Sequence, residues 1–267
     1  MNNIALGRYI PLNSFMHKID PRAKIIAMII LLITIFIPAS FYGYAIIAAI
    51  VLLATILSKL NLNFIWKSMK PMMFMLAFLC IINMFMIRTG DIAFSILSFN
   101  VYSDAISQTL YIVIRLTLMI VITTILTATT KPMSLTLGIE DLLSPLKVIK
   151  VPASEIAMMI SIALRFIPTL IEETQRIMKA QASRGVDLQE GSIKEKLTAI
   201  ISLIVPLFVS AFQKATDLAD AMEARGYIPG EYRTRYKVLK MKLSDYMIIL
   251  LAIGVLSTNI ILMVYVI

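Results

Sequence analysis

Five long apolar stretches dominate this sequence and constrain its fold more than any other feature. A helix that crosses a lipid bilayer needs about 20 mostly apolar residues. The stretches that approach this length are 23–37, 41–57, 71–87, 105–128 and 245–267. Each run is continuously apolar, whereas the strands of a membrane β-barrel alternate apolar and polar residues in segments of about ten. The sequence therefore predicts an all-α integral membrane protein with about five transmembrane helices, the first of which is expected to be a retained span rather than a cleaved signal.

The composition supports this class and argues against several kinds of chemistry. Hydrophobic residues make up 59% of the 267 residues and charged residues 15%, whereas soluble domains average about 45–50% and about 25%. There is one cysteine, Cys80, and one histidine, His17, so an internal disulfide is excluded and a thiolate or histidine metal cluster is not expected. The sequence contains no G-x-x-x-x-G-K-[ST] motif and hence no P-loop for ATP. We therefore expect a chain that is not an enzyme, with no catalytic residues and no cofactor or metal ion of its own.

The region between Lys131 and Lys242 differs from the apolar stretches. It holds two long helical patterns, 154–184 and 193–225, which begin apolar, contain Pro168 and Pro206 respectively, and end charged. The sequence thus predicts three parts: an N-terminal transmembrane domain with about four spans (1–130), a cytoplasmic module of two long kinked amphipathic helices and a shorter one (131–242), and a C-terminal transmembrane helix (243–267).

The distribution of basic residues predicts the orientation. Lysine and arginine collect on the cytoplasmic side of membrane proteins. With five spans and a cytoplasmic N-terminus, every basic residue faces the cytoplasm except Arg88 in an outer loop and Arg115 within a span. We therefore expect a multi-pass protein of the plasma membrane whose long amphipathic helices lie at or partly in the inner leaflet; an arrangement with seven spans remains open. The net charge of +9 is assigned to this topology and to anionic lipid, with no nucleic acid as a partner.

The two long helical patterns end alike. The first ends in Ala182, Ser183, Arg184 and Gly185, and the second ends in Ala224, Arg225 and Gly226. Glycine commonly takes the left-handed conformation after a helix, and a nearby arginine meets the negative end of the helix dipole, so each copy could be only a helix cap. The repetition equally supports a pair of arginine tips that enter acidic clefts of a soluble partner, because a guanidinium pairs bidentately with carboxylates.

Several motifs together make the chain similar to the transmembrane T component (EcfT) of energy-coupling factor transporters, a branch of the ABC-type importers. The similarity covers nearly the whole chain. The motifs that carry it are SFMHKIDPRAK (14–24), the segment from Thr123 to Pro132, GIEDLLSPL (138–146), ALRFIP (163–168), ASRG (182–185) and AMEARGY (221–227). Ser183 stands where this family often has alanine.

The resemblance implies a scaffold and energy-coupling subunit of an importer for vitamins or other micronutrients. Such a T component holds two cytoplasmic ABC-type ATPase subunits, which bind ATP-Mg, through its two Arg-Gly helix ends. It also holds a membrane-embedded S component that binds the substrate, so this chain does not reveal the substrate or whether several S components share it. The leading alternative is a secondary transporter that works alone, a class that usually shows repeated halves and broken helices at the midplane.

Further residues are expected to bind partners or to stabilise the fold. Methionine adapts to varied partners, so Met72, Met73, Met158 and Met159 are candidates for contact with S components, with ordinary packing as the alternative. Asp20 and Pro21 are expected to cap and begin a helix. Arg115 has no obvious acidic partner within the spans, and Arg165 is expected to form a structural ion pair, with Glu140, Asp141 and Glu155 as candidates. Pro168 and Pro206 are expected to kink their helices.

Overall fold

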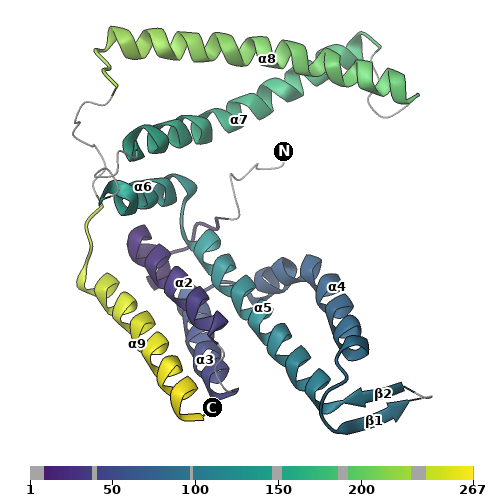
Figure 1. Cartoon of the computed structure of the whole chain (residues 1–267). Helices are drawn as coiled ribbons and strands as arrows, with labels where there is room; N and C mark the ends of the chain where they lie inside the picture. The colour runs from purple at the N-terminus through teal and green to yellow at the C-terminus, as the bar shows by residue number, and fades with distance from the viewer. Residues whose placement is uncertain are drawn as a thin grey trace. The chain divides into compact units, whose positions relative to one another are not determined.

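The computed structural model of the chain describes residues 9–37, 41–96, 99–145, 152–185, 192–229 and 239–266 (Figure 1). The chain divides into two compact units. We call Gly7–Gly138 together with Leu239–Ile267 the membrane unit. The other unit, which we call the helix-pair unit, comprises the described residues of Ile139–Val238.

All five apolar stretches form helices of the membrane unit, which confirms the predicted helical membrane fold. These helices are α2 (Pro21–Phe36), α3 (Phe41–Ser58), α4 (Leu62–Met86), α5 (Ser103–Thr129) and α9 (Leu243–Val266), and α2 is preceded by the short α1 (Phe15–Lys18). Within the described residues, six helices are long and apolar enough to cross a membrane: α3, α4, α5, α7, α8 and α9. The helices of the helix-pair unit, α7 and α8, are the two that a seven-span arrangement would add to the five spans. The choice between five and seven spans remains a prediction.

A short β-hairpin between α4 and α5 was not predicted from the sequence. Strand β1 (Ile92–Ile96) pairs antiparallel with β2 (Phe99–Tyr102), from Ile92 opposite Tyr102 to Ile96 opposite Phe99. The backbone N–H of Ser103 donates to the carbonyl of Asp91 at 2.8 Å and closes the base of the hairpin. The segment is rich in β-branched and aromatic residues, which favour strands, but it is too short to stand out beside the spans.

The core of the membrane unit lies between α2, α3, α5 and α9. Its buried members include Ile35, Ile47, Ile122 and Val255. Helix α4 contributes few buried residues, so most of its apolar side chains lie outside the core of the membrane unit. Gly138 packs closely on the start of α2, because a Cβ at this position would lie 3.2 Å from the Cβ of Pro21.

The helix-pair unit consists mainly of α7 (Ala153–Ser183) and α8 (Ile193–Ala224), both close to their predicted bounds. Pro168 and Pro206 lie inside these helices, which continue through them. The helices run antiparallel: the Gln181 side-chain amide donates to the carbonyl of Ser202 at 3.3 Å, and Lys214 pairs with Glu173 at 3.4 Å. Helix α6 (Pro132–Leu143) contains the boundary between the units.

Candidate functional site

The two long helices end in the same backbone conformation. Arg184 follows α7 with φ −91° and ψ 7°, and Arg225 follows α8 with φ −91° and ψ 11°. The next residues, Gly185 and Gly226, have φ of 82° and 71°. The similarity of the two sequence patterns is therefore also a similarity of backbone geometry.

Hydrogen bonds fix the backbone at each end. The N–H of Gly226 donates to the carbonyl of Glu223 at 2.8 Å, and the N–H of Tyr227 donates to that of Met222 at 2.9 Å. These two bonds form a Schellman motif, whose central residue needs positive φ. Among the described residues, and apart from the two chain neighbours of each glycine, no atom lies within 4 Å of where a Cβ would stand on Gly185 or Gly226. Glycine is therefore needed there for its conformation and not for space.

The arginine side chains are accessible at these ends. Arg184 and Arg225 are both exposed, and so are their small neighbours Ala182, Ser183 and Ala224. Within the part of the chain that the structure describes, no carboxylate forms an ion pair with either arginine. A guanidinium that extends from a helix end flanked by small residues can enter an acidic cleft, because it has five donors and no internal partner.

The two arginine ends are separate sites. Since α7 and α8 are antiparallel, Arg184 and Arg225 lie at opposite ends of the pair (Figure 1). Each helix has just over 30 residues, or a length of about 45 Å at a rise of 1.5 Å per residue. One small binding pocket could not hold both arginines, whereas two similar subunits could each take one.

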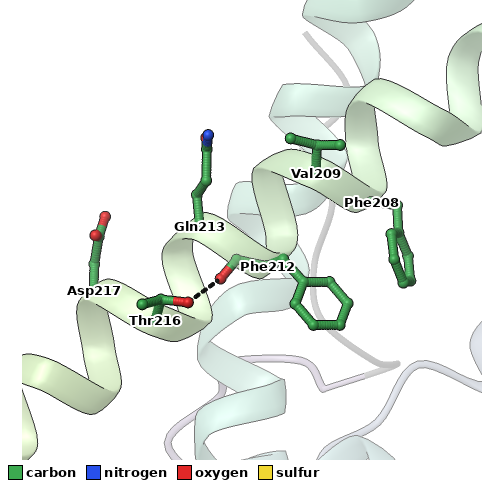
Figure 2. A pocket seen from close by; sticks show the side chains of 6 residues that line it. All are labelled: Phe208, Val209, Phe212, Gln213, Thr216 and Asp217. Carbon is green, nitrogen blue, oxygen red and sulfur yellow. Dashed lines mark hydrogen bonds between the residues drawn. The ribbon is translucent and has the colours of Figure 1, made fainter.

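Helix α8 also carries an exposed apolar face. Its members recur at intervals of three and four residues: Leu197, Ile200, Ile201, Ile204, Val205, Phe208, Val209 and Phe212. Figure 2 shows the shallow hollow where this face meets polar residues, with Phe208 and Phe212 on one side of the helix and Gln213 and Asp217 on another. An apolar surface of this extent is not stable in water and must therefore be covered.

The methionines singled out in the sequence belong to different units. Met72 and Met73 lie on α4 in the membrane unit, and Met73 is exposed. Met158 and Met159 lie near the start of α7, and Met159 is exposed. Both exposed side chains are available for contact, and a shared surface for S components stays a prediction.

A buried polar cluster joins the starts of α2 and α9, which sequence reasoning missed. Asp20 caps α2 by accepting from the Arg22 N–H at 2.9 Å, and Pro21 is the first helical residue. The Asp20 N–H donates to Oδ1 of Asp245 at 3.0 Å, and Oδ2 of Asp245 accepts from the Lys242 N–H at 2.6 Å. Asp245 is 1% exposed, so this carboxylate is a buried link between two helices far apart in sequence.

Lys24 extends the cluster to the end of α5. Its Nζ donates to the carbonyl of Thr129 at 3.1 Å and to Oγ1 of Thr130 at 3.0 Å. A cation at a helix C-terminus is stabilised by the helix dipole. We name Asp20, Lys24 and Asp245, with Thr129 and Thr130, the clasp. Asp245 lies three positions after Lys242, a spacing that could have indicated the cap on α9. No local pattern in the sequence indicates the contact between Asp245 and Asp20.

The two arginines given structural roles differ in their surroundings. Arg115 donates from Nε and Nη2 to the Tyr44 hydroxyl at 3.2 and 2.9 Å, so its partner within the membrane is a tyrosine. Arg165 is exposed on α7, and its ion pair stays a prediction.

Together these features define a class: a helical membrane protein with a pair of long amphipathic helices that end in two alike, exposed arginines. A family model described as cobalt transport protein, CbiQ, matches residues 12–236. Proteins named energy-coupling factor transporter transmembrane protein EcfT are similar over most of their length. The relative from Bacillus subtilis (strain 168) is 44% identical over 239 residues, or 90% of each chain. The relative from Ruminiclostridium cellulolyticum is 43% identical over 266 residues, 100% of this chain and 99% of the other. The chain therefore belongs to the CbiQ/EcfT family.

Proposed function

We propose that this chain is the transmembrane scaffold and energy-coupling subunit of an energy-coupling factor importer. Its relatives carry the name of the transmembrane protein of such transporters, which supports this role. The observation that carries the proposal is the pair of exposed arginines at geometrically alike helix ends. Because the two arginine ends are similar and lie at opposite ends of the helix pair, each can bind one of two similar partner subunits.

In this proposal each arginine end docks into one of two ABC-type ATPase subunits. The ATPases bind ATP-Mg and hydrolyse it, and this chain hydrolyses nothing. Movement of the ATPases passes into α7 and α8, which are continuous over their described residues and so can act as levers. It then reaches the membrane unit through the two connections that leave α5 and enter α9.

The clasp holds the end of α5, from which one of those connections departs, and the start of α9, at which the other arrives. Lys24 binds the end of α5, and Asp20 binds the start of α9 through Asp245. Because both connections are tied to the start of α2, a displacement of α7 and α8 would be transmitted to several spans together.

The remaining partner is a membrane-embedded S component that binds a vitamin or another micronutrient. The exposed apolar face of α8 supports this part of the proposal, since such a surface must be covered and a membrane-embedded partner would cover it. The chain then lies in the plasma membrane with its N-terminus and the helix-pair unit on the cytoplasmic side, as the distribution of lysine and arginine favours.

Charge reversal at the arginine ends tests the proposal. Arg184→Glu and Arg225→Glu should each weaken copurification of the ATPase subunits, and the double variant should release them and abolish ATP-dependent uptake in vesicles. Removing a buried ion-pair partner costs about 3–5 kcal/mol, whereas an arginine that only caps a helix contributes about 0.3–1 kcal/mol. Arg176→Glu is the matched control, because Arg176 is also an exposed arginine on α7.

The outcome separates the two readings of the arginines. If the double variant keeps both ATPases and full uptake, Arg184 and Arg225 act only as helix caps. If the wild-type chain takes up substrate alone in vesicles, it is a secondary transporter, and the scaffold role is wrong.

A further inference from the structure

Arg115 on α5 has more hydrogen-bond donors than the protein provides acceptors for. A guanidinium has five N–H donors. Two of them are used by the Tyr44 hydroxyl, which itself lies 3.3 Å from the carbonyl of Ile35 and donates to it. Over the described residues, Arg115 has no carboxylate partner and no second acceptor. Among the described residues, three donors of Arg115 are therefore left without an acceptor and its charge without a counter-charge.

The position of Arg115 along α5 limits which groups can accept hydrogen bonds from its unused N–H donors. The Lys24 contact places the start of α2 level with the end of α5. Measured from Thr129, Arg115 is about 21 Å along α5, and α2 is about 24 Å long at 1.5 Å per residue. The guanidinium thus lies level with the end of α2 and the start of α3. If the clasp marks one boundary of the bilayer, about 21 Å is most of the thickness of a hydrocarbon core of about 30 Å. A long arginine side chain reaches the headgroup region from such a depth.

The surroundings of Arg115 suit a lipid headgroup. The guanidinium carbon lies 5.8 Å from the centroid of the Phe36 ring, and Tyr111 packs against Tyr44 beside it. Tyrosine is enriched at the boundary between hydrocarbon and headgroups, and Tyr111 is only partly buried. The side chain of Arg115 is only partly buried, so its unused donors are open to a ligand.

We propose that Arg115 binds the phosphate of a phospholipid in the leaflet on the side of the β-hairpin. The Tyr44 hydroxyl orients the guanidinium, and the free N–H groups donate to the phosphate oxygens as a fork. A phosphate, unlike a carbonyl, also neutralises the charge. The bound lipid lies where α2, α3 and α5 meet and so belongs to the packing of the membrane unit.

Native mass spectrometry of the full-length chain in detergent, titrated with dioleoylphosphatidylglycerol, measures this binding. We expect one retained lipid on the wild type and an apparent affinity about tenfold lower for Arg115→Gln. Arg115→Lys keeps the cation but lacks the fork, so it should lie between them. Arg88→Gln is the matched control, because it removes an exposed arginine near the same β-hairpin and should bind like the wild type.

Three further experiments identify the molecule that supplies the acceptor for the Arg115 guanidinium. A diglycosyl diacylglycerol, which has no phosphate, should not be retained, and millimolar inorganic phosphate should not displace the phosphatidylglycerol. In the wild type, a phosphatidylglycerol with a photoreactive headgroup should label the end of α2, the start of α3 or the middle of α5.

Five results would overturn the proposal. Equal retention by Arg115→Gln and the wild type would remove Arg115 from lipid binding. Retention of the glycolipid, displacement by free phosphate or labelling elsewhere would exclude a phospholipid at this site. If Arg115→Gln instead loses a copurifying membrane protein while it keeps the lipid, the acceptor is on that protein.

Discussion

Replacing Asp245 by alanine should destabilise the membrane unit by about 2–4 kcal/mol. The carboxylate accepts two backbone N–H groups, one from Asp20 at 3.0 Å and one from Lys242 at 2.6 Å. Asp20 is 7% exposed, and a buried donor that loses its acceptor costs about 1–3 kcal/mol. Lys242 is exposed, so water replaces its acceptor and the loss is that of a helix cap, about 1 kcal/mol. The two losses add because they affect different donors.

Reversible unfolding in mixed micelles with increasing SDS, followed by circular dichroism, measures this difference. Asp245→Asn keeps one acceptor oxygen and should cost about half as much. Asp217→Ala is the control: Asp217 is an exposed acid on α8, and such substitutions change stability by about 0.5 kcal/mol or less. If Asp245→Ala is as stable as this control, the contact between α2 and α9 contributes nothing and our description of the clasp is wrong.

Three further predictions concern topology, helix ends and partner binding. In a Cys80→Ser background, Lys194→Cys should resist impermeant thiol reagents in intact cells and react in lysed cells; labelling in intact cells would contradict the five-span arrangement. Alanine at Gly185 or Gly226 must adopt a positive φ at a cost of about 1–2 kcal/mol. ATPase copurification should therefore weaken about fivefold to thirtyfold. Unchanged copurification would show that these helix ends need no fixed backbone geometry. Isoleucine at Met72, Met73, Met158 and Met159 should weaken S-component copurification more than ATPase copurification, and equal losses would count against an adaptable methionine surface.

The helices and most of their ends were predictable because the forces that set them are local. The predicted start of α4 was wrong, because the helix begins at Leu62, nine residues before the predicted stretch 71–87, and continues through Pro71. A continuous apolar run predicts a membrane helix wherever it occurs, and all five runs are helical. Pro21 at the start of α2 and glycine after α7 and α8 take conformations that these residues favour by their own chemistry. The repeated Arg-Gly pattern was also predictable as a helix end, because the backbone conformation of each copy depends only on the last helical turn before it.

The partners of the buried polar residues were decided by the tertiary structure alone. Asp20 and Asp245 are separated by 225 positions, and Lys24 and Thr129 by 105. The sequence shows the charge on Arg115 but not the Tyr44 hydroxyl, because a tyrosine in an apolar run looks like any other aromatic residue. In the same way, the β-hairpin depends on pairing between two short segments and not on the periodicity of either. Hydropathy and helix caps act within one or two turns of the chain, whereas a buried donor takes whichever acceptor the packing of distant helices brings within about 3 Å.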